Sequence, residues 1–360
     1  MTYLQLLHAG LILASTSAYT NLSAQAHSIS KTIADCGCDT ACYTEEVTNL
    51  SCTGDKITFK SNGLPHKSHI MMQGITATNQ QLPTPHDYDF SINRNSSINA
   101  DPTETVPGAI GVAVNGIPLF DPGTQGPIVA ATGKTPNAAE QGELDVCGGH
   151  AGRGDDYHYH IAPKCLIEDM GQEAIDVKRQ PIGYSSDGFP ILALGWFDKA
   201  NDIEDKLDAC RGAQDANGSY FYNVQSSDAF AILDCYSGTP MRFARDKWDK
   251  RLDASGKEIE GMPIKMAISN YSSETLDGQT CYTMSGVLGD VQVQLNSGST
   301  SRVSGTEGSV FYCSQSCYGQ FIEKSGVGRG RTAIFDRQVS GCPQSLTAAS
   351  NNGFEAYQGN

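Results

Sequence analysis

The feature that most constrains the fold of this chain is an internal repeat. Residues 110–119 (IGVAVNGIPL) align without gaps on residues 182–191 (IGYSSDGFPI). In each copy an Asn-Gly or Asp-Gly dipeptide separates two apolar segments, and such dipeptides accept the positive φ angles of a tight hairpin turn. A repeat of this kind indicates two similar supersecondary units that pack against each other. We therefore expect two equivalent hairpins within one β-rich domain.

A second pair of matching blocks follows the two hairpins. Residues 144–149 (LDVCGG) precede the tetrapeptide YHYH, and residues 207–212 (LDACRG) precede the tetrapeptide YFYN with the same spacing. Both tetrapeptides alternate in a way that indicates strands. Each repeated unit is therefore predicted to consist of a hairpin, a loop and a further strand.

The chain has twelve cysteines, all beyond residue 26, and this number indicates disulfides formed in an oxidising compartment. The even count predicts six bridges. The repeat pairs the loop cysteines with the cysteines that follow them, so we expect the bridges Cys147–Cys165 and Cys210–Cys235. Connectivity does not follow from spacing alone. For the cysteine-dense segment 36–42 the alternative is a zinc knuckle.

Residues 1–26 are typical of a signal peptide. An apolar run from Leu4 to Leu13 is followed by small residues and by AQA at residues 24–26, a suitable cleavage site. No Lys or Arg precedes the apolar run, so the amino terminus alone supplies its positive charge. The run is too short to cross a bilayer, and no later stretch is long enough. We expect an extracytoplasmic protein, secreted or periplasmic, with no membrane span.

The composition favours strands over helices. The chain has 38 glycines, and only 18% of its residues are charged. Alternating polar and apolar residues continue at 291–295. Short helices are expected at 198–208, near 166–177 and near 315–324. We predict an all-β fold with few short helices, built from internally duplicated hairpin-loop-strand units and stapled by disulfides.

These patterns divide the chain into four parts. They are a signal peptide at 1–26, a cysteine-rich N-terminal extension at 27–52, the duplicated β domain at 53–273 and a β-rich, cysteine-containing C-terminal extension at 274–360.

The candidate functional site is a histidine cluster around the tetrapeptide YHYH. Alternate side chains of a strand share a face, so His158 and His160 project together while Tyr157 and Tyr159 point to the other side. His150 lies in the glycine-rich loop before this strand and can fold back toward it. Three imidazoles on one divalent ion would leave a coordination position open for water or substrate, as in catalytic zinc sites.

The repeat supplies an internal control for this assignment. The framework cysteine, the Leu-Asp pair and both tyrosines occur in both copies, whereas the histidines occur in one. The aligned pairs are His150 and Ala213, His158 and Phe221, and His160 and Asn223. Residues confined to one copy are candidates for function. The alternatives are metal-free catalytic or ligand-binding histidines, and a purely structural role.

Three further histidines, His66, His69 and His86, also precede residue 161. They are candidate ligands of a shared or second ion site, although single exposed histidines are common surface residues.

Acidic residues near the histidines are candidates for supporting roles. Asp155 and Asp156 directly precede the YHYH strand, where a carboxylate can ligate the ion, orient an imidazole or act as a general base. An ordinary turn explains them equally well. Asp187 most simply occupies the Asp-Gly turn of the second hairpin and is kept as a lesser site candidate.

Charge and ligand chemistry narrow the function. A formal net charge of −15 argues against a nucleic-acid partner, which requires a basic face. A histidine cluster favours zinc or copper, and a tyrosine beside the ion would favour copper or ferric iron. The first hypothesis is a metal-dependent enzyme, by default a hydrolase. The second is a non-catalytic metal carrier or a ligand- or carbohydrate-binding module. The substrate stays open.

Residues 147–163 (CGGHAGRGDDYHYHIAP) resemble the YHYH domain family, which is named after the tetrapeptide. Residues 115–122, 181–191 and 207–210 are also similar to the pattern of that family, and the resemblance covers roughly residues 57–240. It implies an exported domain found widely in bacteria and in some eukaryotes, and it supports the histidine site without implying a reaction. The cysteine-rich extensions fall outside it.

Overall fold

The computed structural model describes residues 27–77, 80–124, 127–131, 133–152, 155–227, 229–241, 266–289, 291–294, 300–314, 316–323, 332–338, 341–346 and 354–355. The signal peptide predicted over residues 1–26 lies outside the described residues, as does Leu295.

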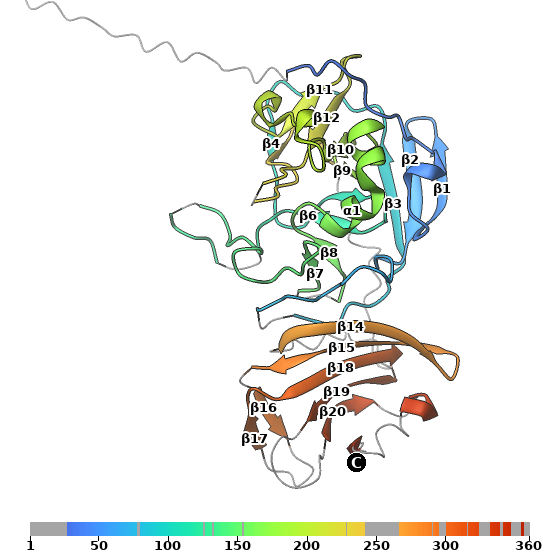
Figure 1. The fold of residues 1–360 in the computed structure, drawn as a ribbon, viewed down its shortest axis with the longest axis vertical. Helices are drawn as coiled ribbons and strands as arrows, with labels where there is room; N and C mark the ends of the chain where they lie inside the picture. Colours follow the sequence, from blue (N-terminus) through green and yellow to red (C-terminus); the bar gives the residue numbers. More distant parts are fainter. Residues whose placement is uncertain are drawn as a thin grey trace, which may run out of the picture.

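The described chain is β-rich with few short helices, as predicted (Figure 1). Its largest sheet has eight strands. In spatial order these are β11 (Gly212–Gln214), β12 (Tyr220–Asn223), β10 (Pro190–Leu192), β9 (Gly183–Ser185), β5 (Ala109–Ala113), β6 (Pro118–Phe120), β8 (His158–Tyr159) and β7 (Gly149–His150).

The pattern of strand pairing in this sheet is the same when counted from either edge. On one side β7 pairs antiparallel with β8, β8 parallel with β6, and β6 antiparallel with β5. On the other side β11, β12, β10 and β9 follow the same sequence of pairings. We call β5 to β8 the first half and β9 to β12 the second half. The two copies of the sequence repeat occupy equivalent places in these halves; an origin of the symmetry in a duplication stays a prediction.

The first glycine of each hairpin is required by the junction between the halves. β5 and β9 pair antiparallel there, with Val112 opposite Tyr184. A Cβ on Gly111 would lie 2.6 Å from the carbonyl oxygen of Tyr184, and a Cβ on Gly183 would lie 2.6 Å from that of Val112. Only glycine allows the two strands to approach this closely.

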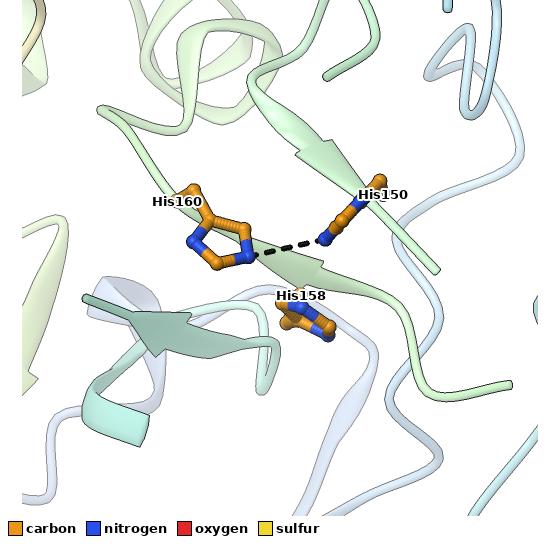
Figure 2. A group of neighbouring side chains, drawn as sticks. All are labelled: His150, His158 and His160. Carbon is orange, nitrogen blue, oxygen red and sulfur yellow. Dashed lines mark hydrogen bonds between the residues drawn. The ribbon is translucent and has the colours of Figure 1, made fainter. Parts of the chain in front are cut away.

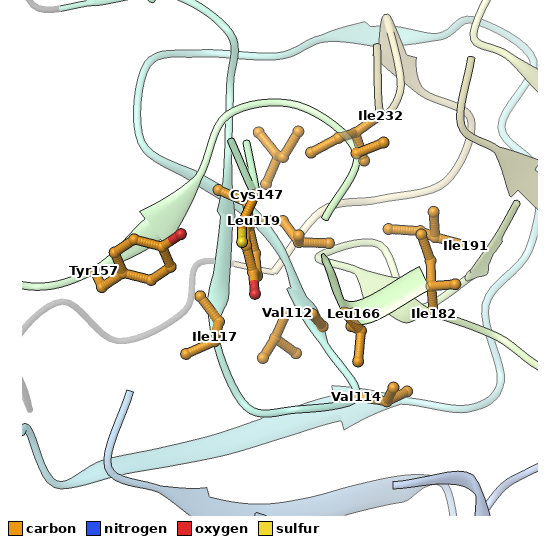
Figure 3. Packing of buried hydrophobic residues seen from close by; sticks show 14 of the residues in the cluster. Val112, Val114, Ile117, Leu119, Cys147, Tyr157, Leu166, Ile182, Ile191 and Ile232 are labelled. Atoms are coloured by element: carbon orange, nitrogen blue, oxygen red, sulfur yellow. The ribbon is translucent and has the colours of Figure 1, made fainter. Parts of the chain in front are cut away.

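The apolar residues of both hairpins form the core of the sheet (Figure 3). Fully buried side chains from the two halves meet there and contact a helix that covers them; they are Val112, Ile117, Leu119, Ile182, Ile191 and Leu166. Burying one such side chain contributes about 1.5–3 kcal/mol. This core fixes β6, and β6 in turn positions β8 through the pair Leu119–Tyr159.

Two smaller sheets flank the eight-stranded one. The first has the order β1 (Val47–Thr53), β2 (Lys56–Ser61) and β3 (Tyr88–Asn93). The second pairs β4 (Thr103–Glu104) with β13 (Cys235–Tyr236).

The C-terminal extension folds into its own antiparallel sheet, which lies below the rest of the molecule in Figure 1. Its strands, in order, are β14 (Met266–Leu276), β15 (Gln279–Leu288), β18 (Glu307–Ser314), β19 (Cys317–Glu323), β20 (Thr332–Gln338) and β21 (Phe354–Glu355). The pairing is antiparallel except between β20 and β21, which are parallel. A separate two-stranded ribbon consists of β16 (Val291–Gln294) and β17 (Thr300–Val303). The Gly74 amide donates to the Ile268 carbonyl at 3.3 Å, so β14 contacts the main domain. The boundaries predicted after residues 52 and 273 fall inside β1 and β14.

Helical structure is short. α1 (Lys164–Gln172) buries Leu166 and Ile167 and continues as the π-helical turn η2 (Glu173–Val177), close to the predicted 166–177. The helix expected at 198–208 is instead two 3-10 turns, η3 (Lys199–Asn201) and η4 (Glu204–Lys206). One further 3-10 turn is η1 (Thr40–Cys42).

The helix expected near 315–324 is wrong, because β19 occupies this segment. Gly319 weakens a helix there, whereas Tyr318 and Phe321 favour a strand. β19 also lies between β18 and β20, and both neighbours satisfy its backbone hydrogen bonds.

All twelve cysteines are paired in six disulfides. The predicted bridges Cys147–Cys165 and Cys210–Cys235 are confirmed. The remaining pairs are Cys36–Cys42, Cys38–Cys52, Cys281–Cys313 and Cys317–Cys342. The zinc knuckle considered for segment 36–42 is therefore wrong, since its thiols are oxidised to disulfides.

Among the described residues, no helix has both the length and the apolar character that crossing a bilayer requires.

Candidate metal centre

A buried carboxylate shapes the loop that delivers His150 to the site. Asp145 Oδ1 accepts hydrogen bonds from the amides of Cys147 (2.9 Å) and Gly149 (3.0 Å). Asp145 Oδ2 accepts from the amide of Met72 and from the Tyr157 hydroxyl, both at 2.7 Å. Burial raises the pKa of Asp145 to about 6, although these four donors favour its ionised form. The loop is thereby fixed to the strand that carries the other histidines.

The short ribbon β7–β8 brings the three histidines together (Figure 2). His150 on β7 is the register partner of His158 on β8, and His160 follows two residues later on the same face. The three ring centroids are 4.9 to 5.0 Å apart, and the Nε2 atoms of His150 and His160 are 3.1 Å apart. Each of the three residues is only 4–6% exposed. The predicted triad is thus a compact, buried cluster.

An oxygen atom lies beside Nδ1 of each imidazole. His158 Nδ1 donates to the carbonyl of Asp156 at 2.9 Å, and His160 Nδ1 donates to the carbonyl of Asp121 at 2.5 Å. His150 Nδ1 lies 3.0 Å from the amide oxygen Oε1 of Gln80. A carbonyl oxygen can only accept, so the proton of each neutral ring resides on Nδ1. The lone pairs of the three Nε2 atoms are then left for a common partner.

Burial keeps the site in the form that binds metals. It lowers the pKa of His150 well below the ordinary histidine value, and the neighbouring His158 and His160 lower it further. Burial, assisted by His158, lowers the pKa of His160 to about 3. These two rings are therefore neutral at pH 7, which is the state that donates a lone pair to an ion.

The spacing of the ring nitrogens fits a small d-block ion. Ligand nitrogens that share one tetrahedral zinc at about 2.0–2.1 Å lie about 3.3 Å apart, close to the 3.1 Å between His150 and His160. One nitrogen from each histidine lies within 4.8 Å of the others, and no fourth His, Cys, Asp or Glu of the described residues joins this group. The donor set therefore consists of three imidazoles.

Gly152 leaves room beside the ring nitrogens. A Cβ at this position would lie 3.3 Å from His150 Nε2 and 3.0 Å from His150 Cε1. A side chain there would crowd the space that an ion on Nε2 needs, so glycine preserves the cradle.

Phe120 stacks on the ring of His158. The two rings stack with centroids 3.8 Å apart, and the same phenyl ring meets His160 edge-on at 5.8 Å. Phe120 is 7% exposed, so it shields this flank of the triad from water.

The tyrosines of the tetrapeptide point to the other face of β8, as predicted. The Tyr157 hydroxyl donates to Asp145, and the Tyr159 hydroxyl accepts from Nδ2 of Asn115 at 3.1 Å. Both are fully buried. Neither is placed to bind an ion held by the three Nε2 atoms.

The structure places Asp155 and Asp156 in different surroundings. Asp156 Oδ2 lies 3.3 Å from His158 Nδ1, on the side of the ring opposite Nε2, so this carboxylate can orient the imidazole. Asp155 lies 3.3 Å from His86 Nε2 and accepts a hydrogen bond from the Thr84 hydroxyl at 2.9 Å.

The other predicted site residues do not join the triad. His66 lies with Glu45 and Ser68, and His69 pairs with Asp169 at 2.6 Å. Asp187 belongs to the second half of the sheet, where it accepts from the Tyr222 hydroxyl at 2.7 Å, from the Gly238 amide at 2.9 Å and from the Ser185 hydroxyl.

The sequence analysis missed four residues that position the triad. Phe120 and Asp121 differ from their aligned counterparts Leu192 and Ala193, so the repeat alone could have singled them out. Gln80 and Glu143, whose Oε2 lies 3.7 Å from His150 Nδ1, fall outside both repeated blocks.

A comparison with known families identifies the segment that carries the site. The family model described as YHYH protein matches residues 89–210. The match contains the three histidines, Asp145, Asp121 and the bridge Cys147–Cys165. No curated protein and no solved structure matches the chain.

Proposed function

Residues 89–210 of this chain are a YHYH domain, and from that premise we propose that the domain binds one divalent metal ion through His150, His158 and His160 and acts as a metal-dependent hydrolase.

One observation carries the proposal. One ring nitrogen from each histidine of the buried triad lies within 4.8 Å of the others, and an oxygen atom lies beside Nδ1 of every ring. Outer partners of this kind fix the tautomer and orientation of metal-ligating histidines. A core imidazole also needs an acceptor for its N–H, so the convergence of the three rings is the feature that points to an ion. Without a partner, the Nε2 lone pairs of His150 and His160 would face each other at 3.1 Å, and an ion removes this repulsion.

Zinc suits the donor set best. Neutral imidazoles bind zinc and copper well. Tyr157 and Tyr159 are committed to hydrogen bonds on the opposite face, which removes the reason to favour copper or ferric iron. All twelve cysteines are in disulfides, so no thiolate competes for the ion.

Three protein ligands leave one position of a tetrahedral ion for water, and bound zinc lowers the pKa of such a water to about 7. The chain's own residues hold the rings: Asp156 and Gln80 lie on the Nδ1 sides of His158 and His150. We therefore assign Asp156 to positioning rather than to proton transfer.

A second candidate function is a non-catalytic metal carrier or ligand-binding module. The low exposure of the triad, 4–6% per residue, favours it, because a deeply held ion exchanges slowly and admits few substrates.

We also propose export to the periplasm or the cell exterior. Six disulfides and no free cysteine among the described residues support this proposal, because disulfides persist in oxidising compartments. The apolar segment before residue 14 supplies the matching signal.

The test is elemental analysis of the full chain, purified after expression with its own amino-terminal segment. We expect about one zinc per chain in the wild type, and at least tenfold less in Gly152→Ala and His158→Asn. His66→Asn is the matched control and should keep its metal. Equal metal content in His158→Asn and the wild type would refute the site.

Hydrolysis is tested on the same samples with chromogenic carboxylate and phosphate esters. The hydrolase proposal requires turnover that disappears on removal of the metal and returns with zinc. Stoichiometric zinc without such turnover would favour the carrier or binding module.

A further inference from the structure

A cavity of about 420 Å³ lies beside α1. Its walls come from the N-terminal extension, the loop after β2, the first hairpin turn and α1; we call it the α1 cavity. Asn115, which lines it, donates to the Tyr159 hydroxyl at 3.1 Å, and Tyr159 points away from the histidine triad. The α1 cavity is therefore separate from the proposed metal site, across the strand β8. Its volume is within the range of small-molecule sites.

The lining of the α1 cavity combines acidic and apolar side chains. Glu45, Glu46 and Asp169 contribute carboxylates, and the described residues that line it include no Lys or Arg. Leu166 and Met170 of α1 and Val114 contribute the apolar wall of the cavity. An acidic pocket with an apolar wall suits a positively charged ligand that also carries an apolar group.

Three lining residues have a buried polar atom without a hydrogen-bond partner. These atoms are Thr44 Oγ1, Glu46 Oε2 and His69 Nδ1. His69 Nε2 lies 2.6 Å from Asp169 Oδ2 and donates to it, so Nδ1 of the neutral ring presents a lone pair. Carboxylate and imidazole atoms of this kind need a donor, and a buried polar atom left unpaired costs about 1–3 kcal/mol. Glu46 Oε2 and His69 Nδ1 thus both need a donor, whereas the Thr44 hydroxyl can donate or accept.

From the cavity, its charge and its unpaired acceptors, we propose that the α1 cavity binds an organic cation, namely an amine whose ammonium group reaches Glu46 and whose apolar part contacts Leu166 and Met170. This site goes beyond the proposed metal function and does not depend on it.

A metal ion explains these observations less well. Glu45, Glu46 and His66 place ligand atoms within 4.8 Å of one another. However, His66 and Glu45 are at the exposed rim, with side chains 37% and 80% exposed, and His66 Nδ1 already contacts the Ser68 hydroxyl at 2.6 Å. An ion there would leave the apolar wall and the unpaired His69 Nδ1 without a partner.

The test is isothermal titration calorimetry of the full chain with phenethylamine, octylamine and agmatine. The neutral alcohol 2-phenylethanol, close to phenethylamine in shape, serves as the uncharged control. We expect at least one amine to bind with a dissociation constant below about 1 mM, and 2-phenylethanol to bind at least tenfold more weakly than phenethylamine if that amine is bound.

Two variants locate the binding. Glu46→Gln keeps the size of the side chain and should weaken amine binding at least tenfold. Ala174→Phe should fill the cavity and abolish binding, which distinguishes occupancy of the cavity from attraction to surface charge. The exposed Glu140→Gln is the matched charge control and should leave the affinity unchanged.

The proposal is overturned if none of the three amines binds below 10 mM, or if Glu46→Gln binds the best amine as well as the wild type does. It is also overturned if Mn²⁺ or Ca²⁺ binds in a Glu46-dependent manner while the amines do not. Loss of the metal from the triad, tested with His158→Asn, should leave amine binding intact, so failure of the two proposals can be told apart.

Discussion

The two halves of the eight-stranded sheet share one backbone plan and differ in what covers one face. In the first half, that face carries His150, His158 and His160, and one ring nitrogen of each lies within 4.8 Å of the others. In the second half the aligned Ala213 and Phe221 are fully buried in an apolar cluster. The same strand pairs therefore support a polar site on one side and a closed core on the other.

The second half fills the space that the triad occupies in the first. Ile29 of the N-terminal segment packs with Leu192 and Phe221, and its amide donates to the carbonyl of Gln214 on β11. The side chain of Asn223, aligned with His160, is hydrogen-bonded to the backbone: its Oδ1 accepts from the Leu194 amide at 2.8 Å. Nothing there requires an ion.

The supporting frame, by contrast, is nearly identical. Asp208 repeats the role of Asp145, accepting from the amides of Cys210 and Gly212 and from the Tyr220 hydroxyl. Because the frame recurs without the histidines, the frame alone does not need them. The histidines of the first half therefore occupy a frame whose counterpart in the second half is closed by apolar side chains.

The largest effect is expected from giving the first half the residues of the second. The combined variant His150→Ala, His158→Phe, His160→Asn should lose its metal almost completely, from about one ion per chain to below about 0.1. Its unfolding free energy without metal should stay within about 2 kcal/mol of the wild type, since Ala and Phe suit this frame. Elemental analysis and urea unfolding measure the two quantities.

The outcome of this swap decides whether the two frames are equivalent. A variant that fails to fold would mean that the imidazoles themselves hold the first half together, and that the two frames are not interchangeable.

The next largest effect separates the two frame carboxylates. Asp145→Ala leaves four buried donors unpaired and should cost about 3–5 kcal/mol of unfolding free energy. Asp208→Ala should cost only about 1–2 kcal/mol, because Asp208 is partly exposed and water can replace it. Urea unfolding at pH 7 gives both values, and equal costs would contradict the difference in burial.

The raised pKa of Asp145 also predicts that the free energy of unfolding depends on pH. Its pKa is raised by burial from 3.8 to about 6 in the folded chain, so the folded chain holds a proton that the unfolded chain releases. Its contribution to stability is therefore present at low pH and lost as the pH rises through about 6. Unfolding free energies measured between pH 4 and pH 7 should fall more steeply in the wild type than in Asp145→Ala.

A smaller effect distinguishes the two loop disulfides. Replacing either pair by alanine should lower the unfolding free energy by about 3 kcal/mol, since the closed loops have similar lengths with separations of 18 and 25 residues. Only removal of Cys147–Cys165 should also weaken metal binding, by about tenfold, because this bridge anchors the loop that leads into β7. Competition with a chromogenic chelator measures the affinity, and a loss after removal of Cys210–Cys235 would contradict the assignment.

Local signals made much of this architecture predictable from the sequence. The Asn-Gly and Asp-Gly turns predicted both hairpins, and the repeat predicted the bridges Cys147–Cys165 and Cys210–Cys235. Strand alternation put His158 and His160 on one face.

What depended on distant contacts could not be predicted. Gln80 contacts His150 although 70 residues separate them in the sequence, and the carbonyl of Asp121 contacts His160 at a separation of 39 residues. No periodic pattern in the sequence indicates either contact. His66 and His69 were predicted as candidate metal ligands, and the sequence did not reveal that the N-terminal extension and α1 bring carboxylates to them. The segment 315–324 was wrong as a helix because its ladder partners lie on β18 and β20.

The smallest effect concerns the ring that flanks the triad. Phe120 aligns with the fully buried Leu192 of the second half, so Phe120→Leu copies a side chain that this frame already accommodates. Losing the stack against His158 should weaken metal affinity about threefold to tenfold and cost about 1 kcal/mol of stability. The reverse change, Leu192→Phe, should destabilise by about 1–3 kcal/mol through overpacking and leave the metal affinity unchanged. If both variants shift the metal affinity alike, then the phenyl ring acts through general packing rather than by holding His158. The stack of Phe120 on His158 would then not distinguish the first half from the second.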